Sequence, residues 1–130
     1  MKTALVTIGG SASVFEAAKK MAGHNIGSLL VESGGKITGI VTDSDLVKKC
    51  LAAENVNQKI SDIASKHLIG IAPEADLSEA AKLMGQKKVQ RLAVQKSGRV
   101  VGIISQSDIV RISPSLYDLI AQKQALQART

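Results

Sequence analysis

The chain contains an internal duplication, and this feature limits the folds available to it more than any other. Residues 13–47 align with residues 76–110 at a constant offset of 63 positions, without a gap, and 13 of the 35 aligned pairs are identical. The letters EAAK at 16–19, for example, recur at 79–82. The same substructure must therefore be built twice, and two similar halves packed about a pseudo-twofold axis are the expected arrangement.

Each copy predicts the order strand, helix, strand, strand, helix, which is a mixed α/β (α+β) fold. A capping pattern opens the first helix of each copy, with Ser13 before Glu16 and Asp76 before Glu79. Two apolar segments around a glycine-containing turn then predict a hairpin. The expected segments are 5–8, 13–23, 27–42 and a helix from about 43 in the first copy, and 68–72, 76–87, 91–105 and a helix from about 106 in the second.

Apolar residues at helical spacing predict which helix faces are buried in the first copy. The residues expected to face inward are Val14, Ala17, Ala18 and Met21 on the first helix and Leu46, Val47, Cys50 and Leu51 on the second. Cys50 is the single cysteine, so it forms no internal disulfide and is compatible with a reducing compartment. It is expected to be a small buried hydrophobic residue rather than a reactive thiol.

The duplication divides the chain into a first repeat at 1–54, a second repeat at 55–112 and a tail at 113–130. The letters KISDIAS at 59–65 predict a short helix that leads into the second repeat, and nothing equivalent precedes the first. The tail is expected to be an amphipathic helix. Its apolar stripe consists of Leu116, Leu119, Ile120 and Leu126.

The composition argues against an enzyme and against a membrane protein. The 130 residues include two histidines, one cysteine and no tryptophan. These are too few ligands for a Cys/His metal site, and no GxSxG elbow is present. No apolar run approaches the ~20 residues of a membrane span. The apolar start ends at Gly9-Gly10, which favours a first strand over a signal peptide. A cytoplasmic, non-catalytic protein that requires no cofactor is expected.

The formal net charge of +6 is unevenly divided. Residues 1–65 carry seven basic and six acidic side chains, whereas residues 66–130 carry ten and five. A basic second half suits solubility, a phosphate-bearing ligand or nucleic acid, and charge alone does not distinguish these. Nucleic acid is the less favoured partner because stacking aromatic residues and a major-groove helix motif are absent from the sequence.

The two copies share one motif: a glycine, two apolar residues, a hydroxyl residue, two variable residues and an aspartate. The segments are GIVTDSD at 39–45 and GIISQSD at 102–108, and each ends a strand and opens a helix. A helix N-terminus attracts phosphate, a hydroxyl there can bond a phosphate oxygen, and the aspartate can accept two hydrogen bonds from a ribose diol. The same spacing also forms a capping box, which needs no ligand. The pattern leaves both roles open.

With these features the chain resembles a tandem CBS-domain pair, also called a Bateman module, and in particular a small standalone CBS-domain protein. The resemblance covers about residues 3–112 and rests on the repeat, on KISDIAS, on VQRLAV at 89–94 and on both Gxx[TS]xxD segments. It implies paired β-α-β-β-α units that leave two clefts. In that family the clefts bind adenosine-containing ligands such as AMP, ADP, ATP or S-adenosylmethionine.

The resemblance also implies roles for individual residues. The aspartates of the motif would bind ribose hydroxyls, and the Thr and Ser would bind phosphate. An arginine would be a further phosphate contact, a lysine near the second cleft adds positive charge, and apolar residues of the first strands would flank the base. The residues in these roles are Asp45 and Asp108, Thr42 and Ser105, Arg91 and Lys88, and Ile8 and Ile71.

The two copies differ at one position that bears on charge. The residue that aligns with Arg91 is Ser28, so the first cleft lacks a cation that the second has. A charged phosphate ligand is therefore expected to prefer the second cleft.

Three functions remain open from the sequence. The leading prediction is a regulatory sensor that binds an adenine nucleotide, forms a homodimer and acts on an unknown target protein. The alternatives are a nucleic-acid-binding protein that uses the basic second repeat, and a dimerisation module whose clefts hold no ligand.

Overall fold

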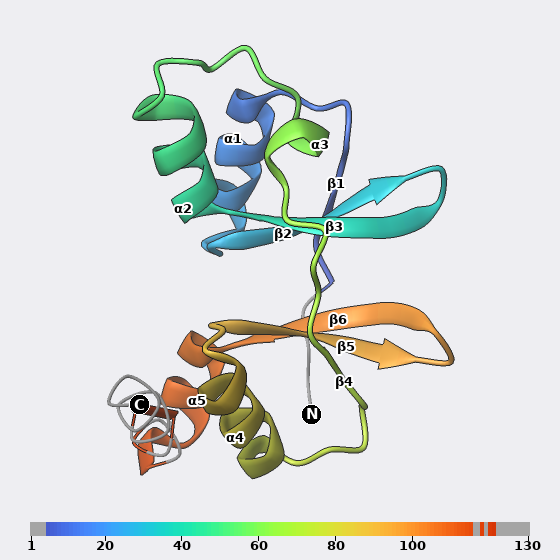
Figure 1. Cartoon of the computed structure of the whole chain (residues 1–130), viewed down its shortest axis with the longest axis vertical. Helices are drawn as coiled ribbons and strands as arrows, with labels where there is room; N and C mark the ends of the chain where they lie inside the picture. The colour runs from blue at the N-terminus through green and yellow to red at the C-terminus, as the bar shows by residue number, and fades with distance from the viewer. Residues whose placement is uncertain (1–4, 116–117, 119, 122–130) are drawn as a thin grey trace. The chain divides into compact units, whose positions relative to one another are not determined.

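The computed structural model describes residues 5–115, 118, 120 and 121, and it divides into two compact units. One unit spans residues 5–68, and the other begins at Ile69. Each contains a three-stranded sheet with helices on one face (Figure 1). The predicted mixed fold with two similar repeats is confirmed.

The first unit contains the elements in the predicted order. They are β1 (Thr7–Gly9), α1 (Val14–His24), β2 (Ser28–Ser33), β3 (Lys36–Thr42), α2 (Asp43–Asp45), the π-helix η1 (Leu46–Leu51) and α3 (Ile60–Ile63). The sheet order is β1-β2-β3, with β1 parallel to β2 and β2 antiparallel to β3. A parallel pair needs a crossover connection, and α1 provides it.

The second unit repeats this arrangement. Its elements are β4 (Gly70–Ile71), α4 (Leu77–Lys87), β5 (Arg91–Lys96), β6 (Arg99–Ser105) and α5 (Gln106–Ile112). The sheet order is β4-β5-β6, again with a parallel and then an antiparallel pair. The hairpin register shifts after Val31 in one unit and after Val94 in the other, which are equivalent positions.

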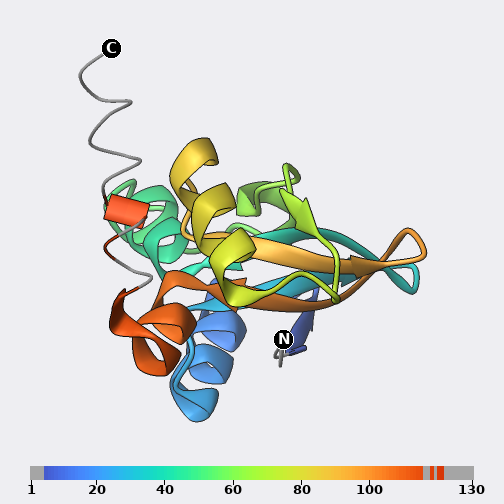
Figure 2. The same ribbon diagram turned by 90° about the horizontal axis from the view of Figure 1, so that it is seen from below.

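The hairpin turns follow from residues that accept a left-handed backbone. Gly34 and Gly35 have φ values of 59° and 78°, and Ser97 and Gly98 have 53° and 76°. Two successive positive φ angles make the type I′ turn that matches strand twist. In each unit this turn lies at the end of the sheet away from the helices (Figures 1 and 2).

Each unit has its own apolar core between the sheet and its helices. In the first unit, Leu29, Val31 and Val41 of the sheet pack with α1 and η1. In the second, Leu92, Val94 and Ile104 pack with α4 and α5. Because successive side chains of a strand point to opposite faces of the sheet, Leu29 and Val31 share one face, as do Leu92 and Val94.

The structure corrects the expected inward faces at three positions. Ala18 is exposed, and the exposed fractions of Val47 and Leu51 are 54% and 60%. Val47 and Leu51 lie on the helix face next to that of Leu46 and Cys50, in the π-helix where the Ala52 N–H bonds the Val47 carbonyl five residues back. Leu46 and Cys50 pack in the core, whereas the face beside them does not, and Val110, which aligns with Val47 in the regular helix α5, is likewise 40% exposed.

The short helix α3 belongs by its contacts to the first unit. Ile60 and Ile63 are buried in its core. The Ile60 N–H donates to the Ala12 carbonyl at 3.0 Å, and Ser65 pairs with Ile40 of β3. The sequence repeats place the start of the second repeat at residue 55. The contacts between residues instead divide the chain after Leu68, because the connecting segment packs on the unit that precedes it.

The predicted tail helix at 113–130 lies largely outside the described residues. Among those described, Ile120 is buried and packs into the core of the second unit. In that unit Ala81 is fully buried, whereas the equivalent Ala18 of the first unit is exposed.

Gly39 of the first motif is required by a close approach of the backbone. A Cβ atom built there would lie 2.5 Å from the Ser65 carbonyl oxygen.

We expect Gly39→Ala to lower the free energy of unfolding by about 1–3 kcal/mol, because backbone atoms must move to relieve the clash. Gly9→Ala is the control, since no atom lies within 4 Å of its Cβ position. Equal denaturant midpoints for the two variants would contradict this account.

Candidate functional site

Both motifs lie where the last strand of a sheet meets the following helix, and the hairpin register sets their neighbours. In the second unit Ser105 lies directly opposite Arg91 across the β5–β6 pair. In the first unit Thr42 lies opposite Ser28 in the same register. The structure thus brings the predicted phosphate contacts Arg91 and Ser105 together. It leaves a neutral side chain at the equivalent place in the first unit.

In the second copy the motif forms a complete capping box. The Asp108 N–H donates to Ser105 Oγ at 3.2 Å, and the Ser105 N–H donates to Asp108 Oδ2 at 2.8 Å. The Ser105 hydroxyl also donates to Oδ2 at 3.0 Å. The other carboxylate oxygen, Oδ1, lies 2.6 Å from the Arg111 guanidinium.

The first copy forms the same box. The Asp45 N–H donates to Thr42 Oγ1 at 3.1 Å, and the Thr42 N–H donates to Asp45 Oδ2 at 3.0 Å. Here Oδ1 lies 3.2 Å from the ammonium group of Lys49. The capping role left open by the sequence is therefore present in both copies. In both copies the Oδ1 atom meets a cation and takes no part in the cap.

A hollow of about 540 Å³ lies beside the second motif. It is lined by Gln90, Arg91, Ser105, Gln106, Ser107 and Val110. Strand ends, a helix N-terminus and a guanidinium group meet there, a combination suited to an anionic ligand. The hollow lies within the second unit and gives the predicted residues Arg91 and Ser105 a common surface.

The remaining predicted site residues lie elsewhere in their units. Lys88 is the exposed C-terminal cap of α4, with a φ of 55°. Ile71 pairs with Val94 and packs against the core. Neither of these residues lines the hollow beside Ser105. Their roles remain predictions.

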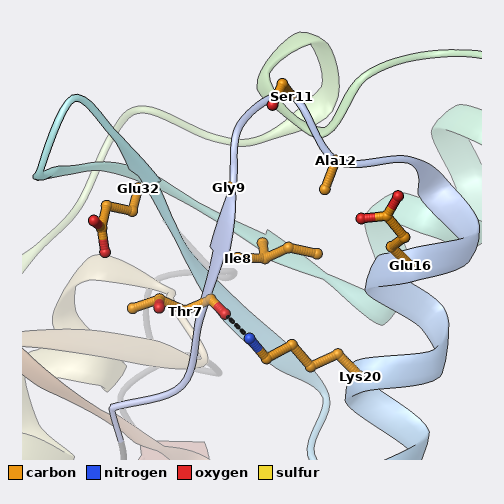
Figure 3. Close-up of a pocket in the computed structure, with 8 residues that line it drawn as sticks. All are labelled: Thr7, Ile8, Gly9, Ser11, Ala12, Glu16, Lys20 and Glu32. Atoms are coloured by element: carbon orange, nitrogen blue, oxygen red, sulfur yellow. Dashed lines mark hydrogen bonds between the residues drawn. The ribbon is translucent and has the colours of Figure 1, made fainter.

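Ile8 lies at a different hollow, of about 600 Å³, along the outer edge of β1. Figure 3 shows its side chain directed toward α1, with Glu16 and Lys20 on that helix and Glu32 on the other side of β1. The Lys20 ammonium donates to the Thr7 carbonyl. Within the first unit, Ile8 is thus separated from Thr42, and its predicted role beside a base also remains a prediction.

Sequence reasoning missed Lys49, which contacts the motif aspartate of the first copy. Its spacing of four residues from Asp45 was the available signal, because such pairs share a helix face.

Cys50, next in sequence, is fully buried as expected. Burial raises the pKa of its thiol, and the nearby Asp45 carboxylate adds to this effect. The thiol is therefore protonated at neutral pH.

Comparison with known proteins agrees with this geometry. The family model of the CBS domain matches residues 1–52 and 60–115, one match for each repeat. The chain belongs to the CBS-domain family. The resemblance seen in the sequence is therefore confirmed. Pairs of CBS domains are regulatory ligand-binding modules.

Several curated relatives share most of this chain's length. CBS domain-containing protein YhcV of Bacillus subtilis is 30% identical over 110 residues, which cover 84% of this chain and 79% of YhcV. The inosine-5'-monophosphate dehydrogenase of Korarchaeum cryptofilum is 35% identical over 106 residues, 81% of this chain. Relatives can be longer than this chain, which spans 21% of that dehydrogenase and 66% of uncharacterized protein MJ0450 of Methanocaldococcus jannaschii.

Two solved structures bear on ligand and assembly. The CBS domain pair of protein MJ0100, in complex with 5'-methylthioadenosine and S-adenosyl-L-methionine, is 29% identical and superposes with a TM-score of 0.74 over 85% of this chain and 92% of its own. A hexameric CBS-CP12 protein from bloom-forming cyanobacteria is 33% identical, with a TM-score of 0.75 over 87% of this chain and 68% of its own. No helix among the described residues is both long and apolar enough to span a bilayer.

Proposed function

We propose that this CBS-domain pair is a regulatory sensor that binds an adenosine-type ligand, such as AMP, ADP, ATP or S-adenosylmethionine, and performs no catalysis. The observation that carries the proposal is the surface at the second motif, where Arg91 and Ser105 face each other beside a hollow and Asp108 stands one turn into the helix. The adenosine ligands bound by the similar MJ0100 pair support this ligand class.

The proposed roles follow from the hydrogen-bonding capacity of each group. Asp108 Oδ1 accepts from the ribose diol, while Oδ2 keeps its bond to the Ser105 N–H. The Arg91 guanidinium and the Ser105 hydroxyl contact phosphate. In the first copy Asp45 and Thr42 act in the same way. Ile8, Ile71 and Lys88 complete the proposed set as apolar neighbours of the base and as a further cation.

The two sites differ in their preference for charge under this proposal. Arg91 is present at the second site, and its counterpart Ser28 carries no charge. A nucleotide with phosphate groups therefore binds more tightly at the second site.

The ligand signal passes to a target protein that the module contacts. A cytoplasmic location fits the single buried Cys50.

Asp108→Ala tests the ribose contact. Loss of two charge-assisted hydrogen bonds is expected to weaken adenosine binding at least tenfold, measured by calorimetric titration. The lost cap lowers the free energy of unfolding by about 1 kcal/mol. Asp76→Ala is the matched control, because Asp76 also caps a helix of the second unit but lies outside the motif. Unchanged affinity in Asp108→Ala would remove this residue from the site.

Arg91→Ala tests the phosphate contact. The affinity for AMP is expected to fall about tenfold or more, while the affinity for adenosine changes little, because the guanidinium interacts with charge on the phosphate. Arg99→Ala removes the same charge from an exposed position near the hairpin turn and serves as the control. Equal losses of affinity for AMP and adenosine in Arg91→Ala would contradict a phosphate role.

We also propose that the chain forms a homodimer through its helices. Leu46 and Ile109 are buried in their own units. Three other apolar side chains of these helices are more than half exposed: Val47 at 54%, Leu51 at 60% and Ile112 at 61%. Val47 and Leu51 lie four residues apart on η1, and contiguous exposed apolar groups of this kind mark interfaces. The hexameric CBS-CP12 protein shows that a similar pair assembles into oligomers.

Light scattering at micromolar concentration is expected to give about twice the chain mass of 13.6 kDa. Leu51→Glu should shift the mass toward the monomer, because it places a charge in the proposed interface. Val101→Glu changes an exposed apolar residue on β6 and should leave the dimer intact. A monomer mass for the unsubstituted chain across a dilution series would refute the dimer.

A further inference from the structure

Lys49 contacts two different elements of the first unit. Its ammonium group lies 3.2 Å from Asp45 Oδ1 and donates a 2.9 Å hydrogen bond to the carbonyl oxygen of Ile63. Asp45 belongs to the motif, and Ile63 is the last residue of α3, from which the chain runs toward the second unit. One charged group is therefore shared between the candidate site and the connecting segment.

The backbone at Lys49 is held in place by the π-helix and by a glutamine. The Gln58 side-chain amide donates to the Lys49 carbonyl at 2.8 Å and to the Asn55 carbonyl at 3.1 Å. The Asn55 N–H bonds the Cys50 carbonyl five residues back. π-Helical turns are uncommon and occur frequently at functional sites. This one sets the position of Lys49 between α3 and the motif.

The bond to Ile63 stabilises the end of a very short helix. The four residues of α3 leave carbonyl groups without partners in the helix, as every helix end does. The Ile60 carbonyl accepts from the Ala64 N–H, and the next segment is tied to β3 by the Ser65 N–H and the Ile40 carbonyl. The Ile63 carbonyl instead depends on the Lys49 ammonium.

The second copy has no such link among the residues that the structure describes. Its aspartate, Asp108, pairs with Arg111, whose side chain is 76% exposed and, within the described ranges, bonds that aspartate alone. At the repeat offset of 63, Lys49 aligns with Ile112, so the shared cation is a property of the first copy alone.

We propose that Lys49 couples occupancy of the first site to the connecting segment 60–66. This inference rests on the proposed function, because it takes a ribose diol as the group that engages Asp45. Hydrogen bonds from the diol to Oδ1 weaken the ion pair that holds Lys49, and the ammonium then binds the Ile63 carbonyl less firmly. Because coupling between sites is reciprocal, loosening α3 also changes the affinity of the first site by the same factor.

Hydrogen exchange of the full chain, followed by mass spectrometry, tests the link without ligand. Lys49→Met keeps the apolar stem and removes the charge, and amide exchange in residues 60–66 is expected to rise about two- to tenfold, the range for loss of one hydrogen bond. Lys48→Met is the matched control on the same helix, and Arg111→Met breaks the equivalent pair of the second copy. Exchange in 60–66 should be unchanged in both controls. No rise in Lys49→Met, or an equal rise in Lys48→Met, would overturn the link.

The same measurement with saturating adenosine tests the coupling. In the unsubstituted chain the ligand is expected to speed exchange in 60–66, and in Lys49→Met it should add no further change although calorimetry shows that adenosine still binds. Binding without faster exchange in the unsubstituted chain would overturn the coupling but leave the proposed function intact. Absence of binding would overturn the proposed function and with it the coupling, whereas the ligand-free comparison would still decide whether Lys49 holds α3.

Discussion

The hairpin register in each unit is the constraint on which the rest of the structure depends. Because side chains alternate between the faces of a strand, a slip of one residue would move every side chain of the strand to the opposite face of the sheet. The register observed places Leu29 and Val31 in the core and, at the adjoining end of the same strands, puts Ser28 opposite Thr42. In the second unit the same pairing sets Arg91 opposite Ser105. Core and candidate site are thus produced by one set of backbone hydrogen bonds.

The duplication keeps this frame and varies the groups around it. Both motif aspartates cap a helix through Oδ2 and meet a cation through Oδ1. The cations differ in kind and reach, since Lys49 extends to α3 and Arg111 extends into solvent. The strand partner also differs, with arginine in one copy and serine in the other. A tandem pair can therefore present two sites of one geometry with different charge and different connections to the chain.

Much of this arrangement was predictable because it depends on local patterns. Capping residues, glycines at the turns and the offset of 63 predicted the elements, the hairpins and the position of both motifs. The faces of α1 and η1 were predicted less well. Apolar spacing predicted a wide buried face, but the core covers one edge of it, which leaves Val47 and Leu51 of η1, and Val110 of α5, exposed. A spacing rule shows which residues share a face and contains no information about how much of that face the neighbouring elements cover.

The sequence alone determined the repeat, the family and the chemical types at the motif, because these depend on residue identity and spacing. Only the tertiary structure decided that α3 packs on the first unit, that Gly39 is needed beside the Ser65 carbonyl, and that Lys49 joins Asp45 to Ile63. Each of these depends on contacts between segments far apart along the chain, 14 residues for Lys49–Ile63, 26 for Gly39–Ser65 and 48 for Ile60–Ala12. Such contacts arise when a connecting segment folds back on a finished sheet, and no local pattern specifies where it will touch.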